Sequence, residues 1–501
     1  MKKNDFIELE IEDVTDDGSG IGHYDGMAIF VKDSAVGDRV KAKIVKVKKH
    51  YAFGRVEEII SESHNRVEPA CPVSRQCGGC TLQHISYEAE LELKKTRVIN
   101  CLKRIGGIDN PEEYLEEVVG LGSSPERYRN KMQFPVGKDK DGMTVLGFYA
   151  GHSHSIIPVE DCMIGHEINR YIIAAIKKWC DENKISVYDE ETGKGFLRHV
   201  LTRVGFQTGE LMVCVIINNK KMKFSEELVS CINEALSKAE TKDAIILKSV
   251  VANINTEKTN KILGEETIPV WGQEYITDYI GDVQFRISAQ SFYQVNPVQT
   301  YRLYSRALEY ANLTGNETVW DMYCGIGTIS LFLAKNAKKV IGVEIVPQAI
   351  QDAKQNADLN AIKNAKFYVG KAEEVATDLL SGKGTDDTYE EVPDVIVVDP
   401  PRKGCDEKLL NTVIKVKPNR MVYVSCDPAT LARDLKILMA NGFNLEKFSV
   451  FDQFSRSMHV ETVILMSNRN IKPDGYIKLE VNTEELDAAK SGISDTSSED
   501  F

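Results

Sequence analysis

The sequence predicts a multidomain α/β protein, with a small β-barrel at its amino end and a doubly wound α/β domain towards its carboxyl end. The chain has 501 residues, which is too long for one hydrophobic core and suggests about three or four domains. Residues 1–60 alternate polar and apolar positions between turn signals, which favours short strands of a barrel. Residues 285–469 alternate apolar strands with helices, which favours a largely parallel sheet.

Three further segments complete the expected organisation. Residues 61–110 hold a cysteine-rich loop and a helix, and residues 111–284 mix strands and helices as a central α+β domain. Residues 470–501 are acidic and rich in serine, so they are expected to form a disordered tail. The acidic, glycine-containing run 382–391 is expected to be a surface loop.

Composition bounds the class of protein. The hydrophobic share is 42%, typical of a soluble globular chain, and neither a membrane-spanning run nor a signal-peptide core is found. We therefore expect a cytoplasmic monomer with no membrane or protein partner, whose 11 cysteines serve as thiols, metal ligands or nucleophiles. The net charge of -13 disfavours a broadly basic surface but leaves room for local basic patches.

The barrel segment has features of a nucleic-acid surface. Lys41, Lys43 and Lys46 lie on one predicted strand, and Tyr51 and Phe53 follow it. Lysines for phosphates and aromatic rings for bases suit single-stranded nucleic acid. An edge strand protected by lysines would show the same pattern, so both interpretations stay open for this segment alone.

A cysteine loop follows the barrel. Cys71, Cys77 and Cys80 stand among proline and glycine, where a hydrophobic core gives no reason for cysteine. The spacing predicts a metal site, holding either zinc or an iron–sulfur cluster. A fourth ligand is needed, and Cys162 is preferred over His84 and Cys101.

Residues 87–105 are expected to form an amphipathic helix that ends at Gly106 and Gly107. Its inward positions are predicted to be Leu91, Val98 and Leu102, and its outward ones Lys94, Lys95, Arg97, Lys103 and Arg104. The basic face could touch RNA phosphates, although a solvated face is the commoner explanation.

Two predicted strands of the central domain mix cations with aromatic residues. They span residues 128–134 and 195–205. Such a pattern suits phosphate contact and base stacking, and it suits a partly exposed sheet equally well.

The carboxyl-terminal domain opens with a strand, a glycine loop and a helix. Gly325 and Gly327 let the backbone approach a ligand, and the next strand ends on Glu344, placed to accept hydrogen bonds from ribose hydroxyls. The loop lacks the full G-x-G-x-x-G pattern, which disfavours NAD. The form Asp321-x-Tyr323-Cys324-Gly325-x-Gly327 resembles motif I of S-adenosylmethionine-dependent methyltransferases.

Two later strands end on reactive groups. An apolar run from Val395 stops at Asp399, and another from Arg420 stops at Cys426. In open α/β sheets ligands bind at the carboxyl ends of the strands, so a thiol and a carboxylate delivered there suggest a reaction centre. The alternative is that Cys426 is a small core residue, as most free cysteines are.

Four motifs occur together in one order: Phe292-x-Gln294-x-Asn296, Asp399-Pro400-Pro401-Arg402, Ser425-Cys426-Asp427-Pro428 and His459-Val460-Glu461-Thr462. With the barrel and the cysteine loop, they resemble the bacterial RNA uracil-5 methyltransferases. The closest likeness is to the branch that modifies 23S ribosomal RNA and carries a TRAM domain, an OB-like RNA-binding barrel, and a [4Fe–4S] cluster. The resemblance implies a central RNA-binding domain and a Rossmann-like catalytic domain.

The resemblance also implies roles for single residues. Cys426 would be the nucleophile and Glu461 the proton-abstracting base, with Asp399 at the reaction centre. The cofactor S-adenosylmethionine would be contacted by Gln294, Tyr323, Gly325, Gly327, Glu344 and Asp399. The [4Fe–4S] ligands would be Cys71, Cys77, Cys80 and Cys162.

Two positions depart from the family pattern. Asp427 stands where the family usually has asparagine, and a carboxylate facing Cys426 would raise the pKa of the thiol. We expect Asp427 to point away, or to cap the following helix at Ala429. The stretch after Phe454 also lacks an expected proline, which leaves the shape of that loop open.

Three other functions were weighed. A transfer RNA uracil-5 methyltransferase is a close variant, although that branch usually lacks the barrel and the cysteines. Methyl transfer to an exocyclic amine needs no nucleophile, so Cys426 and Glu461 argue against it. A non-catalytic iron–sulfur RNA-binding protein would not need the full set of Gln294, Asp399, Cys426 and Glu461.

Overall fold

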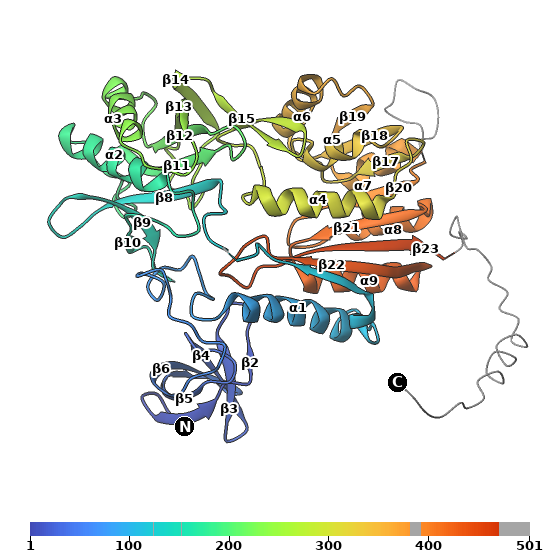
Figure 1. Ribbon diagram of the computed structural model, residues 1–501, viewed down its shortest axis with the longest axis horizontal. Coiled ribbons are helices and arrows are strands. Elements are labelled where there is room, and N and C mark those ends of the chain that lie inside the picture. Colours follow the sequence, from blue (N-terminus) through green and yellow to red (C-terminus); the bar gives the residue numbers. More distant parts are fainter. Residues whose placement is uncertain (124, 152, 381–391, 470–501) are drawn as a thin grey trace, which may run out of the picture.

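The computed structural model describes residues 1–123, 125–151, 153–380 and 392–469 (Figure 1). Both the acidic run 382–391 and the acidic tail 470–501 lie outside the described residues. Within the described part of the chain, no helix combines the length and the apolar character needed to cross a membrane.

The amino-terminal β domain is one six-stranded sheet with a core of its own. The strand order is β1-β5-β6-β4-β3-β2, and inward residues such as Ile29, Val40 and Ala42 are fully buried. The predicted alternation is visible along β1, whose residues alternate between exposed and buried. The strands are β1 (Phe6–Glu10), β2 (Asp13–Val14), β3 (Gly20–Tyr24), β4 (Met27–Lys32), β5 (Arg39–Val47) and β6 (Tyr51–Ser61).

The central domain is a seven-stranded sheet in the order β10-β9-β8-β11-β12-β13-β14. Helices α2 (Asn169–Glu182) and α3 (Ser225–Ser237) pack on one face, and the hairpin of β15 (Tyr275–Ile280) and β16 (Val283–Ser288) packs on the other. This explains why β11 is buried along its whole length. The strands are β8 (Lys131–Lys138), β9 (Thr144–Tyr149), β10 (Ile156–Pro158), β11 (Leu197–Val204), β12 (Glu210–Ile217), β13 (Ile246–Ile254) and β14 (Glu266–Gly272).

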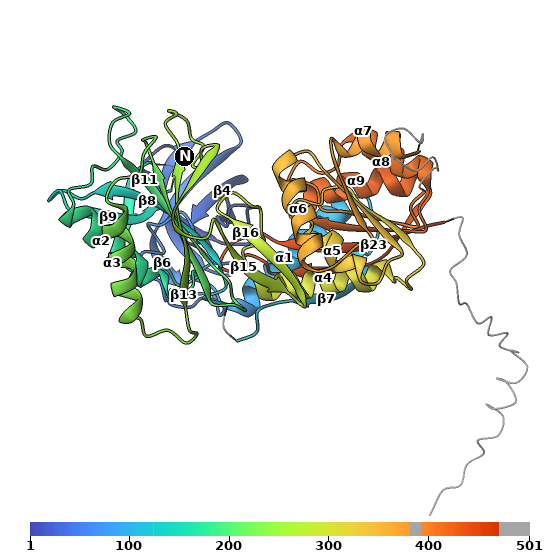
Figure 2. The same ribbon diagram turned by 90° about the horizontal axis from the view of Figure 1, so that it is seen from above.

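The carboxyl-terminal domain is an eight-stranded sheet between two helical layers, as Figure 2 shows from above. The order is β19-β18-β17-β20-β21-β23-β22-β7, and the first five strands are parallel, as predicted. The strands are β17 (Thr318–Asp321), β18 (Lys339–Glu344), β19 (Ala365–Val369), β20 (Val395–Val398), β21 (Arg420–Ser425), β22 (Phe443–Phe451), β23 (Glu461–Asn468) and β7 (Leu115–Val119).

The two helical layers bury opposite faces of this sheet. One layer holds α4 (Pro297–Ala311), α5 (Thr328–Ala334) and α6 (Pro347–Leu359). The other holds α1 (Tyr87–Arg104), α7 (Ala372–Leu380), α8 (Glu407–Val416) and α9 (Pro428–Ala440). Alternate residues of β17 show the division, because Val319 belongs to the first core and Trp320 to the second.

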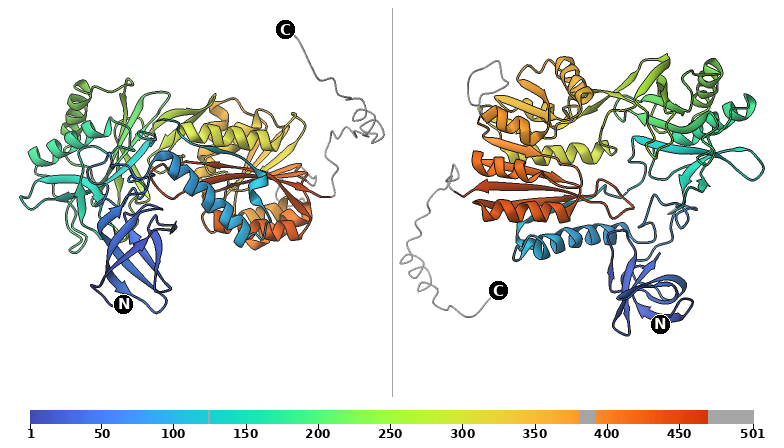
Figure 3. Two further views of the ribbon diagram at one scale, coloured as in Figure 1. Left: turned by 60° about the horizontal axis from the view of Figure 1, so that its bottom comes forward. Right: turned by 180° about the vertical axis from the view of Figure 1, so that it is seen from behind.

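The structure places residues 87–119 with the carboxyl-terminal domain. Strand β7 extends the sheet beside β22, and a short 3₁₀ helix, η1 (Pro111–Tyr114), precedes it. Helix α1 buries Val98 and Leu102 in the same core as Tyr423 of β21. The domain expected to begin at 285 therefore also includes an amino-terminal segment, whose helix α1 lies beside α9 and β22 (Figure 3).

The prediction for Lys94 on the outward face of α1 was wrong, whereas Lys103 and Arg104 of that face are exposed as expected. The helix itself is confirmed, and Val98 and Leu102 are buried as expected, but Lys94 is also fully buried rather than solvated. Its ammonium pairs with Glu90 on the same helix and with Asp452, which lies in the loop between β22 and β23. Helical periodicity could not reveal a partner so distant in the sequence.

Candidate active site

Three strand ends bring Cys426, Asp399 and Glu461 to one edge of the carboxyl-terminal sheet. Asp399 follows β20 and Cys426 follows β21, and these two strands are parallel neighbours. Glu461 begins β23, which runs antiparallel to β21 with Ser425 opposite Thr462. Continuing that register by one residue places Cys426 opposite Glu461.

The electrostatics of these groups show that they act on one another. Burial, followed by the charges of Glu461 and Asp399, raises the pKa of the Cys426 thiol to about 12, and the nearby Arg402 opposes the rise. Burial and then Asp399 raise the pKa of Glu461 well above its ordinary value. Burial also raises the pKa of Asp399, and Asp321 adds to the effect. The ionised forms of the thiol and of the two carboxyls therefore disfavour one another in this buried site.

Asp427 caps α9, as expected. Its Oδ1 accepts hydrogen bonds from the backbone N–H groups of Ala429 at 3.0 Å and Thr430 at 2.9 Å. These bonds satisfy two of the free donors at the helix start and orient the carboxylate towards the helix. Asparagine at this position could accept the same bonds, so both residue types suit the cap.

A cavity of about 640 Å³ opens beside the glycine loop between β17 and α5, and we call it the glycine-loop cavity. Four of the six residues predicted to contact the cofactor line it, namely Tyr323, Gly325, Glu344 and Asp399. Phe292 also lines it and is 72% exposed. The sequence had marked Phe292 only as part of a motif.

The two predicted glycines of this loop have different local roles. Gly325 has φ +54° with open space around a Cβ position, so its backbone leaves room at the cavity. Gly327 has φ +84°, and a side chain there would press on Ala353 and Phe367 at 3.3 Å. Gly325 also donates a hydrogen bond to Glu344 Oε2 at 3.3 Å, which joins the loop to the end of β18.

Gln294 lies away from the described lining of the glycine-loop cavity. Its side-chain oxygen accepts a 3.4 Å hydrogen bond from Gln453 in the β22–β23 loop, and its backbone oxygen accepts one from Asn130 at 3.0 Å. Gln294 therefore stands where the central domain, the start of α4 and the β22–β23 loop meet. A role in binding cofactor stays a prediction for this residue.

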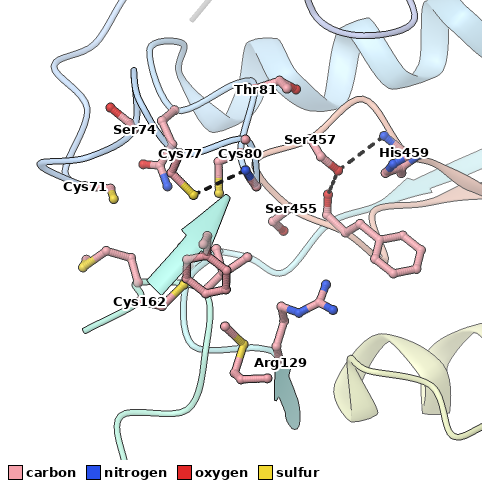
Figure 4. A pocket seen from close by; sticks show the side chains of 18 of the residues that line it. Cys71, Ser74, Cys77, Cys80, Thr81, Arg129, Cys162, Ser455, Ser457 and His459 are labelled. Atoms are coloured by element: carbon pink, nitrogen blue, oxygen red, sulfur yellow. Dashed lines mark hydrogen bonds between the residues drawn. The ribbon is translucent and has the colours of Figure 1, made fainter. Parts of the chain in front are cut away.

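A second cavity, of about 670 Å³, lies between the domains, and we call it the cysteine cavity. Cys71, Cys77, Cys80 and Cys162 all line it. Figure 4 shows these four on one side of the cavity and Ser455, Ser457 and His459 of the β22–β23 loop on another. The rest of the wall comes from the β domain, through Asp16 and Asp17, and from the central domain, through Arg129 and Lys131.

The four cysteines face one another without forming a site for a single ion. Burial raises the pKa of Cys80 to about 12, and the other three cysteines of the cavity add to the rise. Among the described residues, no three histidine, cysteine, aspartate or glutamate side chains stand close enough to hold one metal ion. The arrangement thus lacks the compact tetrahedral set that a structural zinc ion requires.

The two weaker candidates for a fourth ligand have other contacts. His84 Nε2 lies 3.1 Å from the backbone oxygen of Ser34 in the β domain, and burial lowers the pKa of the imidazole. Cys101 lies on α1, and it is absent from the described lining of the cysteine cavity. Of the three candidates considered, only Cys162 joins the other cysteines.

The run from Asp399 to Arg402 connects the two cavities. Asp399 and Pro401 line the glycine-loop cavity, whereas Arg402 lines the cysteine cavity. The positive charge of Arg402 opposes the rise in the pKa of both Cys426 and Glu461, so Arg402 acts on the reaction centre. In the sequence, Arg402 appeared only as part of a motif. Its position between two cavities could not be predicted, because it depends on the packing of separate domains.

Comparison with known proteins agrees with this architecture. The family model described as tRNA (Uracil-5-)-methyltransferase matches residues 86–469, and the model of the TRAM domain matches residues 2–56. An uncharacterized RNA methyltransferase of Halalkalibacterium halodurans is 49% identical, covering 94% of this chain and 98% of the relative. One from Clostridium acetobutylicum is 46% identical, covering 93% of this chain and 98% of the relative.

A solved structure is similar over almost the whole chain. It is the Pyrococcus abyssi tRNA (uracil-54, C5)-methyltransferase in complex with S-adenosyl-L-homocysteine. The sequence identity is 27% and the TM-score 0.71, with 92% of this chain and 100% of that chain covered. The chain therefore belongs to the tRNA (uracil-5-)-methyltransferase family of S-adenosylmethionine-dependent RNA methyltransferases and carries an amino-terminal TRAM domain.

Proposed function

We propose that this protein methylates uridine at C5 in 23S ribosomal RNA, through a covalent bond between Cys426 and C6 of the base. The observation that supports this most is the convergence of Cys426, Asp399 and Glu461 at one sheet edge, where the Asp399–Arg402 run borders two cavities. A binding protein or an amine methyltransferase has no need of a nucleophile and a base in that arrangement.

The chemistry explains why a cysteine is needed. C5 of uracil is too weak a nucleophile to accept a methyl group unaided. When the Cys426 sulfur attacks C6, the new S–C6 bond converts the ring to an enolate with electron density on C5. S-adenosylmethionine, when bound in the glycine-loop cavity, would supply the methyl group to C5 by cleavage of its methyl–sulfur bond and leave as S-adenosylhomocysteine. The cysteine thus divides one difficult step into easier ones.

Glu461 completes the reaction in this proposal. It removes the proton from C5, and the electron pair of that C–H bond expels the sulfur of Cys426 from C6. Asp399 lies in the same buried site, and like charges so close disfavour ionisation of both carboxyls. Asp399 therefore holds or releases a proton as the charge on Glu461 changes, while Arg402 favours the ionised base.

We further propose that the cysteine cavity holds a [4Fe–4S] cluster. Each cysteine of such a cluster binds its own iron, so four cysteines are needed. The four cysteines that line this cavity supply that number. Cys71, Cys77, Cys80 and Cys162 would hold the cluster, which would tie the loop after the β domain to the central domain.

The target base must leave its stack to reach Cys426, which calls for RNA contacts outside the catalytic domain. The TRAM domain, Arg129 and Lys131 of the central domain and the β22–β23 loop all border the cysteine cavity. We infer that RNA enters along this cavity.

Transfer RNA is the second candidate substrate. The Pyrococcus abyssi protein is a tRNA (uracil-54, C5)-methyltransferase, and its alignment covers 92% of this chain, so the match includes at least part of the β domain. The β domain therefore does not by itself separate the two substrates.

A transfer assay with purified RNA tests the proposal. Ribosomal and transfer RNA from cells lacking the protein are incubated with it and with S-adenosylmethionine labelled on the methyl group. We expect label as 5-methyluridine in 23S ribosomal RNA and none with Cys426→Ala, which should still bind S-adenosylmethionine. Label in transfer RNA alone would show that transfer RNA and not ribosomal RNA is the substrate. Full activity of Cys426→Ala would refute the covalent mechanism.

A further inference from the structure

Lys94 is a buried charge that joins α1 to the β22–β23 loop. Its side chain is 1% exposed, and the side chains of Glu90 and Asp452 beside it are fully buried. The ammonium donates to Glu90 Oε1 at 2.7 Å, to Asp452 Oδ1 and to the backbone oxygen of Phe454 at 3.2 Å. All three protons of the ammonium are thus used. A buried charge is tolerated only with such complete pairing.

The partners of Lys94 hold further points of the same loop. Tyr87 Oη donates to Asp452 Oδ2 at 2.6 Å, and the hydroxyl of Ser455 donates to the same oxygen. One turn along α1, Arg97 donates to the backbone oxygen of Met458 at 2.7 Å. Side chains of helix α1 therefore contact the β22–β23 loop at several points from Asp452 to Met458.

Arg456 shows that the loop would not hold this shape unaided. Its φ is +67°, a left-handed conformation that costs a residue with a side chain about 1 kcal/mol or more. Its backbone N–H donates to Glu90 Oε1 at 2.7 Å. Its backbone oxygen accepts bonds from Thr81 at 2.8 Å and Leu82 at 3.2 Å, directly after the cysteine loop. Contacts on both sides impose the strained conformation.

The opposite side of this loop forms part of the candidate active site. Phe454, Ser455, Ser457 and His459 line the cysteine cavity, and the loop ends where Glu461 begins β23. We propose that Lys94 is a positioning residue for methyl transfer: with Glu90 and Asp452 it holds the β22–β23 loop in the shape that seats the target uridine against Cys426. The inference rests on the proposed function and assigns a role to a residue remote from the cofactor.

Lys94→Met tests this role, because methionine keeps the length of the side chain and removes the charge. The rate of a single turnover with saturating RNA and S-adenosylmethionine should fall about 100-fold, the usual result of misplacing a reacting group by about 1 Å. Binding of S-adenosylmethionine, measured by calorimetry, should stay within twofold of wild type, because the glycine-loop cavity lies elsewhere. Lys95→Met, which loses only an exposed pair with Glu92, is the matched control and should keep the wild-type rate.

Removal of the surplus negative charge sharpens the test. Lys94→Met leaves Glu90 and Asp452 buried together with only the 3.8 Å pair between Glu90 and Arg456 to offset their charges, so adding Glu90→Gln should recover part of the lost rate, about tenfold. A purely structural role predicts a lower melting temperature with an unchanged rate per folded molecule, and that result would overturn the inference. If Lys94→Met does not fold, Tyr87→Phe decides, since it removes the bond to Asp452 Oδ2 and the bond that Tyr87 Oη accepts from the Leu121 backbone N–H but keeps the ring; a wild-type rate would then reject the role.

Failure of the inference differs from failure of the proposed function. Wild-type protein that methylates no uridine refutes the function whatever Lys94 does. Active wild-type protein with an equally active, folded Lys94→Met variant refutes only the positioning role.

Discussion

The two cavities that meet at Asp399–Arg402 are built in opposite ways. The glycine-loop cavity is formed mainly by consecutive βα units of a single domain, with the glycine loop, Glu344 and Asp399 each at a strand end. The cysteine cavity takes its walls from the TRAM domain, the cysteine loop, the central domain and the β22–β23 loop. One cavity is a local product of the chain, and the other exists only after the domains pack.

The difference assigns separate tasks to the two cavities. A cavity built within one sheet is pre-formed and suits a small cofactor that must be held the same way in every cycle. A cavity between domains can recognise a large, structured substrate through contacts from several of them. Catalysis is expected where both reach the same groups, and the pKa of Cys426 responds to the charge of Arg402, which lines one cavity, and to that of Asp399, which lines the other.

The largest expected effect concerns the cysteine cavity. Cys162→Ser should reduce iron in anaerobically purified protein from about four atoms per chain to almost none, because a hydroxyl replaces one of four thiolate ligands. Iron analysis and visible absorption measure this, with the buried Cys180→Ser as control. If the cavities are independent, S-adenosylmethionine still binds. Zinc without iron in the wild-type protein would contradict the cluster.

A smaller effect is expected in the glycine-loop cavity. Glu344→Gln should weaken S-adenosylmethionine binding about 10- to 100-fold, because a hydrogen bond to a charged group contributes about 1.5–3 kcal/mol. Calorimetric titration gives the Kd, and the iron content should not change. An unaltered Kd would remove Glu344 from the cofactor site, and a parallel loss of iron would show that the two cavities are coupled.

The smallest effect is expected at the junction. Because burial and two carboxylates raise the pKa of Cys426 to about 12, alkylation of this thiol should still increase between pH 9 and pH 10, where an ordinary cysteine of pKa about 8.5 has nearly levelled off. The double variant Asp399→Asn/Glu461→Gln removes both negative charges, lowers the pKa and should speed alkylation at pH 9 about tenfold. Peptide mass spectrometry measures alkylation of Cys426 alone. Identical pH profiles for the wild type and the double variant would show that the two carboxyls do not affect the thiol.

Local patterns in the sequence predicted the carboxyl-terminal domain well. Strands 339–344 and 420–425 and helix 347–359 occur with the expected bounds, since alternation, glycine and proline define them within a few residues. The capping role of Asp427 could also be predicted from the sequence, because a cap depends only on the next three residues.

Contacts between distant segments could not be predicted. Lys94 looked like part of a solvated basic face because its partner Asp452 is 358 residues away. Strand β7 lacks a clear alternation and gains its place from the edge of β22. The loop that lacks the family's proline is instead held by Lys94, Tyr87 and Glu90. These contacts depend on tertiary packing, which no local period records.

The most direct test of the mechanism uses Glu461→Gln with S-adenosylmethionine and a uridine-containing RNA substrate. Attack by Cys426 and methyl transfer should proceed in this variant, while removal of the C5 proton should not. Denaturing gels and intact mass spectrometry should therefore show protein joined to RNA with one added methyl group, and Cys426→Ala/Glu461→Gln should show none. A variant that binds both substrates but forms no adduct would contradict covalent catalysis by Cys426 with Glu461 as the base.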